Sequence, residues 1–221
     1  MTFIAFIPAR AGSQRIKNKN LQKIGSKPLI YYTIKQSLKS EFIKETVVLT
    51  DCNLIKKKSI KYGAHVPFLR PKKISQNNTP MIDTIKYAVR KTKLNKNKKY
   101  KYIVLLQATS PLRTSTDIDN CCRKILNNPK ADCLVTTYDA NEDFHPSKIM
   151  FQDSFGFLKK KKYNIKNRFF IRNGPSILIT RISRVKRYLL GGKILNYIMP
   201  KTRSLDINNI EDLKKARQIL K

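Results

Sequence analysis

The chain has 221 residues and lacks several features that often reveal a function. No apolar run approaches the ~20 residues of a membrane-spanning helix, and the first residues lack the basic start and cleavage site of a secretory signal. The four cysteines contain no Cys-x-x-Cys pair and the two histidines lie far apart in the sequence, which argues against a zinc site. We therefore expect a cytoplasmic protein with reduced thiols and no association with a membrane.

Acidic residues are also scarce, with 14 Asp and Glu against 47 Lys and Arg, so the net charge is +33. Such a charge by itself is typical of proteins that bind nucleic acids. However, lysine greatly outnumbers arginine, whose forked guanidinium suits phosphates and base edges better. The lysines are also spread over the whole chain. We interpret most of the charge as solvated lysine faces, with RNA or a membrane surface as the alternative partner.

Two familiar glycine-rich phosphate-binding signatures are missing. The dinucleotide fingerprint needs three spaced glycines, whereas the opening segment has only Gly12, and no Gly-Lys-Ser/Thr ending occurs anywhere in the chain. The opening segment nevertheless joins an apolar run, residues 3–7, to a loop of small residues, cations and amides from Pro8 to Asn20. Backbone N–H groups and cationic side chains in such a loop suit a ligand with several negative charges, such as a nucleoside triphosphate. The alternative is a basic surface loop after a strand.

The order of apolar and amphipathic segments predicts the fold. Hydrophobic residues make up 41% of the chain, which is enough for a packed core. Strands are expected at residues 2–7, 45–50, 65–68, 102–106, 132–137, 176–180 and 197–199. Helices are expected at residues 51–62, 80–91, 116–128 and 182–190, at the C-terminus, and after Pro28 with Ile30, Ile34 and Leu38 on one stripe. This alternation predicts an α/β fold with a doubly wound, mostly parallel sheet in one domain, residues 1–221.

The predicted sheet also indicates where a ligand binds. Ligands on such sheets lie at the carboxyl ends of the strands. Three polar loops follow strands in this way and are expected to converge: Pro8 to Asn20, Thr50-Asp51 and Gln107 to Arg113. The pattern weakens after Tyr138, and we interpret residues 139–172 as a small β-rich excursion from the main sheet.

Two long motifs carry a family resemblance. The first, which resembles the opening motif of sugar-acid cytidylyltransferases of the acylneuraminate type, reads Ile7-Pro8-Ala9-Arg10-x-Gly12-Ser13-x-Arg15-Ile16-x-x-Lys19-Asn20. The second motif of that family is similar to the segment Leu106 to Thr114. Shorter blocks follow in the family's order: Arg70-Pro71, His145-Pro146-x-Lys148, Asn173-Gly174 and Ser204-Leu205-Asp206-Ile207. The resemblance implies the Rossmann-like fold of nucleotide-diphospho-sugar transferases, with the excursion serving dimerisation.

The resemblance also implies a reaction. Enzymes of this family join CTP to a 2-keto sugar acid: the anomeric hydroxyl attacks the α-phosphorus, pyrophosphate leaves and Mg²⁺ assists. The resemblance therefore implies CTP and a sialic-acid-like sugar as substrates, Mg²⁺ as cofactor and a homodimer, with nucleic acid not expected as a partner. The alternatives are another keto sugar acid (legionaminic, pseudaminic or KDO-like) and a catalytically weak, basic nucleotide- or RNA-binding relative. Family members for eight-carbon acids usually carry Gln-Gly-Asp-x-Pro, which differs from Gln107-Ala108-Thr109-Ser110-Pro111 here.

Individual roles are carried over position by position. The candidate catalytic residues are three cations of the first loop, Arg10, Arg15 and Lys19, whose positive charge suits the triphosphate. The resemblance assigns nucleotide binding to Arg10, Gly12, Ser13, Asn20 and Arg70. It assigns the sugar acid to Gln107, Asn173 and Lys148, the last offered by the dimer partner. Asp206 and Asn208 are the candidate metal ligands, because Mg²⁺ prefers carboxylate and other oxygen ligands.

Several positions depart from the family pattern, and the role of one further residue stays open. Asn208 stands where the family usually has a second aspartate, which lowers the expected affinity for Mg²⁺. Gln14 stands where a lysine is usual and Asn77 where an aspartate is common. Arg113 either contacts a substrate carboxylate or caps its own loop, and the sequence favours neither.

Overall fold

The structure, a computed structural model, describes residues 2–94, 100–140, 145–160, 168–174 and 176–220. In these ranges a seven-stranded sheet has the order β11-β6-β10-β5-β1-β4, and β9 also pairs with β6. The bounds are β1 Phe3–Pro8, β4 Ile43–Leu49, β5 Tyr102–Leu106, β6 Cys133–Asp139, β9 Phe170–Arg172, β10 Ile177–Arg181 and β11 Ile194–Ile198. All run in one direction except β9 and β10, so the predicted mostly parallel sheet is confirmed.

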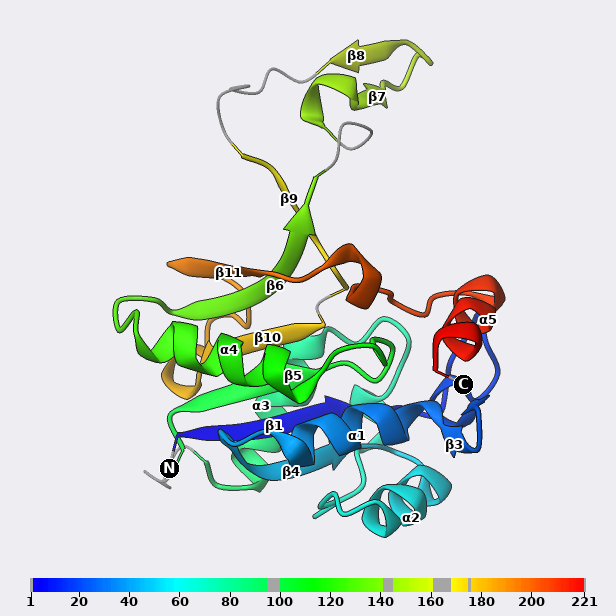
Figure 1. The fold of residues 1–221 in the computed structure, drawn as a ribbon, viewed down its shortest axis with the longest axis vertical. Coiled ribbons are helices and arrows are strands. Elements are labelled where there is room, and N and C mark those ends of the chain that lie inside the picture. The colour runs from blue at the N-terminus through cyan, green and yellow to red at the C-terminus, as the bar shows by residue number, and fades with distance from the viewer. Residues whose placement is uncertain (1, 95–99, 141–144, 161–167, 175, 221) are drawn as a thin grey trace.

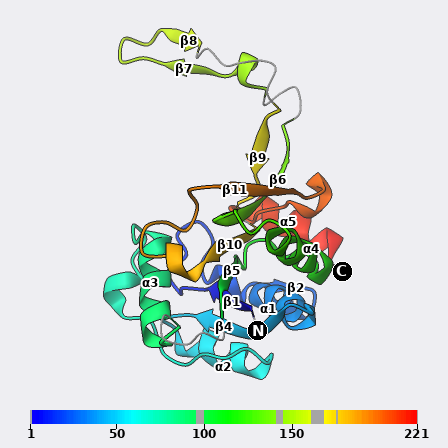
Figure 2. The ribbon, with the colours of Figure 1, turned by 90° about the vertical axis from the view of Figure 1, so that its left-hand side faces the viewer.

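Helices cover both faces of the sheet, as a doubly wound fold requires. They are α1 Leu29–Lys39, α2 Asn53–Lys61, α3 Met81–Lys91, α4 Ser115–Leu126 and α5 Ile210–Ile219. Figure 2 shows α1 and α4 on one face and α3 on the other. The last helix packs beside a two-stranded hairpin formed by β2 Lys23–Ile24 and β3 Lys27–Pro28. Nowhere in the described ranges does a helix have the length and apolarity to cross a membrane.

Strand β1 shows why its sequence is apolar without alternation. Phe3, Ala5 and Ile7 pack into the core on the side of α1 and α4, whereas Ile4 and Phe6 pack into the core on the side of α3. Both faces of the strand are therefore buried, as expected for a central parallel strand. Polar residues are tolerated only where the strand ends, and this places the cationic loop at the edge of the sheet.

Two predicted elements are wrong. Residues 182–190 do not form a helix but a 3₁₀ turn, Ile182–Arg184, followed by turns. Ile182 and Val185 are buried three residues apart, a spacing that a 3₁₀ turn satisfies as well as an α-helix. The segment 65–68 is not a strand either, because the chain there makes only isolated bridges, Val47 with His65 and Thr50 with Leu69.

The apolar face predicted for helix α1 is confirmed for Ile30 and Ile34 and wrong for Leu38. Ile30 and Ile34 are fully buried, but the Leu38 side chain is 49% exposed. Ser37 takes the buried place, and its Oγ lies 2.7 Å from Thr46 Oγ1 on β4. Position 37 continues the i, i+4, i+7 spacing of the helix face that packs on the sheet.

A long arm projects from the sheet between β6 and β9 (Figure 1). Its described part contains a hairpin of β7 Met150–Gln152 with β8 Leu158–Lys160. The hairpin exposes large apolar side chains, of which Phe155 is 84% and Phe157 69% exposed. These strands lie inside the span expected to be β-rich, although residues 141–144 and 161–167 of that span lie outside the described residues.

Candidate active site

The polar loops that follow β1, β4 and β5 meet at one edge of the sheet, as predicted. The backbone N–H of Ala9 donates to the carbonyl oxygen of Leu49 at 2.9 Å, at the point where β1 and β4 end. Two residues later, the N–H of Ala11 donates to Oδ1 of Asp51 at 2.8 Å. The loop after β5 is joined to the segment before α5, since Ile207 N–H donates to the Thr109 carbonyl at 2.8 Å.

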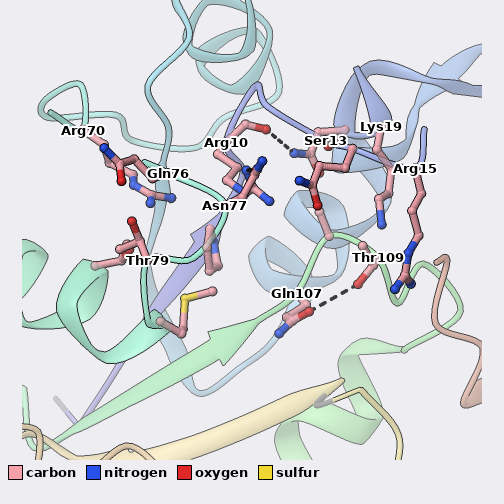
Figure 3. A pocket seen from close by; sticks show the side chains of 16 residues that line it. Arg10, Ser13, Arg15, Lys19, Arg70, Gln76, Asn77, Thr79, Gln107 and Thr109 are labelled. Carbon is pink, nitrogen blue, oxygen red and sulfur yellow. Dashed lines mark hydrogen bonds between the residues drawn. The ribbon is translucent and has the colours of Figure 1, made fainter. Parts of the chain in front are cut away.

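A pocket of about 430 Å³ opens where these loops meet. Figure 3 shows it with Arg70, Gln76 and Thr79 on one wall, Ser13, Arg15 and Lys19 on the opposite wall, and Arg10 and Asn77 between them. Gln107 and Thr109 lie at the end of β5. Seven residues predicted to bind substrate or act in catalysis line the pocket: Arg10, Ser13, Arg15, Lys19, Asn20, Arg70 and Gln107.

The pocket gathers cationic side chains that form no ion pair with a described carboxylate. Among the described residues, no carboxylate oxygen lies within 4.0 Å of the cationic groups of Arg10, Arg15, Lys19 or Arg70. Arg10 donates instead to the neutral side-chain oxygen of Asn77, and Arg70 to the carbonyl oxygen of Ile74. Burial lowers the pKa of Arg70, Asp51 opposes this, and Arg10 lowers the pKa further. An anionic ligand would relieve this accumulation of charge.

The backbone of the first loop is less available than the sequence suggested. The N–H of Ala11 is bonded to Asp51, and the N–H of Ser13 donates to the Ala11 carbonyl at 2.8 Å. These two N–H groups are therefore not available to bind an anion, although the sequence predicted that backbone N–H groups of this loop would do so. The positive potential of the site comes mainly from its side chains. Gly12 is exposed, and a Cβ there would lie 3.4 Å from Nη1 of Arg10.

Asn20 is buried at the base of the loop. Its Nδ2 donates to the Arg10 carbonyl at 3.0 Å, and the residue lines the pocket. Asn20 thus holds the backbone of Arg10 and lies beside the space that the resemblance assigns to the nucleotide.

A second pocket, of about 600 Å³, lies beside the first. It contains the remaining predicted site residues except Gly12 and Lys148, namely Asn173, Asp206 and Asn208. Lys19 connects the two pockets, because it lines the first and its Nζ donates to the Ile207 carbonyl at 2.8 Å, next to Asp206. Burial lowers the pKa of Lys19, the nearby Asp206 opposes this, and Arg15 and Arg10 lower it further. Lys19 therefore interacts electrostatically with charged residues of both pockets.

Asp206 has the features of a ligand-binding carboxylate. Its Oδ1 is buried and has no hydrogen-bond partner among the described residues, whereas Oδ2 accepts a hydrogen bond of 3.0 Å from Nδ2 of Asn208. Gly174 lies against it with φ +83°, and a Cβ on Gly174 would approach the carboxylate to 2.7 Å. A buried carboxylate oxygen without a partner fits a divalent cation. The described residues form no group of three or more His, Cys, Asp and Glu side chains that could hold a metal ion, so the further ligands of a cation here would be Asn208, water or substrate oxygens.

Asn173 lines the second pocket, but its amide is engaged. The side chain is buried, and its Oδ1 accepts a hydrogen bond of 2.7 Å from Thr136 Oγ1. Its Nδ2 donates to Ser204 Oγ at 3.1 Å and to Met199 Sδ at 3.4 Å. A direct contact between this amide and a sugar acid therefore requires one of these bonds to break, and in the structure Asn173 anchors the segment that leads to Asp206.

Lys148 lies far from these residues in the fold. It ends a 3₁₀ turn, Pro146–Lys148, in the projecting arm, and it lines neither pocket of its own chain. The resemblance assigns this lysine to the site of a partner subunit, so its role stays a prediction.

An ion pair between a buried carboxylate and a partly exposed arginine fixes the chain just before Asp206. Asp117, in the first turn of α4, accepts hydrogen bonds from Arg203 Nη2 at 2.8 Å and from Nε at 3.1 Å. It also accepts from the N–H and hydroxyl of Thr114, which completes a capping box. Burial by itself raises the pKa of Asp117, but the bonds from Arg203 and Thr114 outweigh it and lower the pKa below 3.8.

We expect Asp117→Asn to lower the free energy of unfolding by about 2 kcal/mol, because it removes the negative charge from the buried partner of an ion pair. The loss is not larger because the other partner, Arg203, is partly exposed to solvent. Chemical denaturation at neutral pH measures this. A group whose pKa is lowered by folding stabilises the protein above its unfolded pKa and loses that contribution as pH falls through the folded pKa. The difference between variant and wild type should therefore shrink below pH 3.8. Asp139→Asn, which breaks an exposed ion pair with Arg168, is the matched control and should cost less than about 0.5 kcal/mol.

Sequence reasoning assigned no functional role to several residues around the first pocket. Gln76, Asn77 and Thr79 line it from the segment before α3, and Asp51 holds the cationic loop. Asp51 was expected near the site because it follows a predicted strand, and the structure places it there. Asn77 was noted only as a departure from the family pattern. Gln76 and Thr79 carried no signal for the site, because their segment reaches the pocket only through the packing of α3 on the sheet.

Comparison with known proteins agrees with this geometry. A model of the cytidylyltransferase family matches residues 4–218. The chain belongs to this family. A relative that is 33% identical over 227 aligned residues is the N-acylneuraminate cytidylyltransferase of Escherichia coli, and the alignment covers 96% of this chain and 51% of the relative. Another, the CMP-N,N'-diacetyllegionaminic acid synthase of Legionella pneumophila, is 38% identical over 113 residues, which are 51% of this chain and 48% of the relative.

The chain thus spans about half the length of these two curated relatives. Its fold is similar to the solved structure of CMP:2-keto-3-deoxy-manno-octonic acid synthetase complexed with CTP, with a TM-score of 0.74, 16% sequence identity and coverage of 99% of this chain and 98% of the other. This likeness supports the Rossmann-like architecture, and the functional argument rests on the family match and on the two pockets.

Proposed function

We propose that the protein transfers CMP from CTP to the anomeric hydroxyl of a sialic-acid-like 2-keto sugar acid and releases pyrophosphate. One observation carries the proposal. A pocket lined by cations that form no ion pair with a described carboxylate adjoins a second pocket, in which Asp206 presents a buried carboxylate oxygen that no described residue bonds. Membership of the cytidylyltransferase family supports the same reaction.

The residues of the first pocket suit this chemistry. Phosphoryl transfer depends mainly on positioning and on neutralisation of charge that spreads over the phosphate oxygens. In the proposal Arg10, Arg15 and Lys19 neutralise the triphosphate. The nucleotide is held by Arg10, Arg70, Ser13, Asn20 and the backbone at Gly12. None of these steps needs a covalent nucleophile from the protein.

Asp206 is proposed to hold a divalent cation, Mg²⁺, with Asn208 as a weaker second ligand. When bound, the ion would neutralise charge on the phosphate oxygens of CTP. Asn208 brings no charge, and its Nδ2 already donates to Asp206, so the site would depend mainly on one carboxylate. This arrangement suits a cation that is bound together with the nucleotide.

The sugar acid is proposed to occupy the second pocket, with Gln107 at its junction with the first, Asn173 in its wall and Lys148 supplied by a second copy of the chain. The exposed Phe155 and Phe157 of the projecting hairpin support an assembly in which this arm is covered, because apolar patches of this kind mark interfaces. We therefore propose a homodimer and, as before, a cytoplasmic location. Light scattering on the purified protein measures the subunit number.

A pyrophosphate-release assay tests the proposed function. The protein is incubated with CTP and Mg²⁺, alone and with neuraminic, legionaminic or pseudaminic acid derivatives. We expect pyrophosphate only when CTP and one of these acids are both present, and the most active acid identifies the substrate. Absence of pyrophosphate with every acid, together with RNA binding that persists at moderate salt, would favour the nucleic-acid-binding alternative.

A further inference from the structure

The largest fully buried side chain of the described structure is a cation. Arg113, in the loop between β5 and α4, is 1% exposed. Among the described residues no carboxylate oxygen lies within 4.0 Å of its guanidinium. Burying a charge without a direct counter-ion costs free energy. Such a residue is therefore expected where its hydrogen bonds hold structural elements in a required arrangement.

The guanidinium joins three elements through neutral oxygens. Nη1 donates to the Ser176 carbonyl just before β10, and Nη2 donates to Thr33 Oγ1 of α1 at 2.8 Å. Both nitrogens also lie 3.4 Å from the Gln107 carbonyl at the end of β5. Burial lowers the pKa of Arg113 to about 9, with Asp117 opposing the shift, so the group stays charged at neutral pH. It lines neither pocket, which argues against the contact with a substrate carboxylate that the sequence left open.

Residues 107–112 form the loop that precedes Arg113, and this loop connects the two pockets. The Gln107 and Thr109 side chains line the first pocket. The Thr109 carbonyl accepts the N–H of Ile207 at 2.8 Å, and Ile207 follows Asp206 directly. A shift of this loop would therefore move Gln107 and Asp206 relative to each other and to the cations of the first pocket.

We propose that Arg113 is a positioning residue that fixes the 107–112 loop and, through the bond between Thr109 and Ile207, sets the place of Asp206 relative to the nucleotide pocket. Its effect on turnover rests on the proposed function, whereas its effect on the Ile207 segment does not. Arginine is required because its planar fork bonds three acceptors at once, and a lysine ammonium at the end of a flexible chain cannot reach all three.

Hydrogen exchange of Arg113→Lys followed by mass spectrometry tests the structural part. We expect peptides covering residues 205–209 to exchange about tenfold faster than in wild type, because the Ile207 amide loses its fixed acceptor. Peptides from β1 and β4, whose pairing does not involve Arg113, should be unchanged. Arg181→Lys is the matched control, since Arg181 also donates to backbone carbonyls, those of Ala131 and Pro129, at a site away from the pockets, and it should leave residues 205–209 unchanged.

Kinetics test the functional part. Arg113→Lys should lower kcat about 20-fold, because the reacting groups are misplaced. It should also raise the half-saturating Mg²⁺ concentration. The Kd for CTP should change by less than about threefold, because the cations of the first pocket are untouched. If Arg113 merely stabilised the fold, the molecules of the variant that remain folded would show the same half-saturating Mg²⁺ concentration as wild type. Thr33→Val removes one acceptor and keeps Arg113, so it serves if the first variant fails to fold, with a smaller change of the same kind.

The outcomes separate the two hypotheses. If wild type releases no pyrophosphate, the proposed function fails, and the exchange of residues 205–209 still decides the role of Arg113. If wild type is active while both variants keep its kcat, its Mg²⁺ dependence and its exchange at 205–209, the positioning role is wrong. Exchange that rises equally in all peptides would also overturn it, because the effect would then be global.

Discussion

Arg10→Ala is expected to reduce kcat with CTP by about 10²-fold or more, since one charged donor to a transition-state phosphate contributes about 3 kcal/mol. Arg10 lies between the two walls of the first pocket, and its side chain is held by a neutral acceptor, Asn77. Because no carboxylate of the described residues neutralises it, its full charge is available to the phosphates.

Steady-state kinetics of pyrophosphate release measure this effect, and thermal melting confirms that the variant is folded. Arg123→Ala is the matched control: it removes the same charge from the exposed side of α4, where Arg123 donates to Asn120. With a net charge of +33, the loss of one distant cation should barely change the potential at the pocket. Wild-type kcat in the Arg10 variant would remove the first loop from the mechanism.

Asp206→Asn is expected to reduce activity by at least about 10²-fold at a Mg²⁺ concentration that saturates wild type. A catalytic metal contributes several kcal/mol, and Asp206 is the one carboxylate among the described residues that line the second pocket. The substitution keeps the size of the side chain, which matters because Gly174 leaves little room beside it. An additional amide would also face the amide of Asn208, so neither ligand would carry charge.

Titration of activity with Mg²⁺ distinguishes loss of metal affinity from loss of fold. The half-saturating Mg²⁺ concentration should rise in Asp206→Asn and fall in Asn208→Asp, which adds a second carboxylate. Glu211→Gln, an exposed position in the first turn of α5, removes the same charge without lining either pocket and should behave like wild type. An unchanged Mg²⁺ dependence in Asp206→Asn would place the cation elsewhere.

Much of the site could be predicted because its parts follow strands. The apolar run of residues 3–7 predicted a strand buried on both faces, and the carboxyl ends of parallel strands share one edge. The cations from Arg10 to Lys19 were therefore expected to meet the loop after β5, and the pocket contains both. The 182–190 segment was mispredicted because its buried residues suit two kinds of turn. Long-range bonds, such as that of Arg184 with Asp132, accompany the observed conformation.

The sequence by itself determined the order of the strands along the chain, the burial of β1 and the family motifs, since these depend on residues close together in the chain. Only the tertiary structure decided what Arg113 does, because its partners Thr33 and Ser176 are 80 and 63 residues away. The same holds for the Asp206 oxygen that no described residue bonds and for the engaged amide of Asn173. Whether a polar atom is bonded or left open depends on which distant segments pack around it, and no local pattern records that.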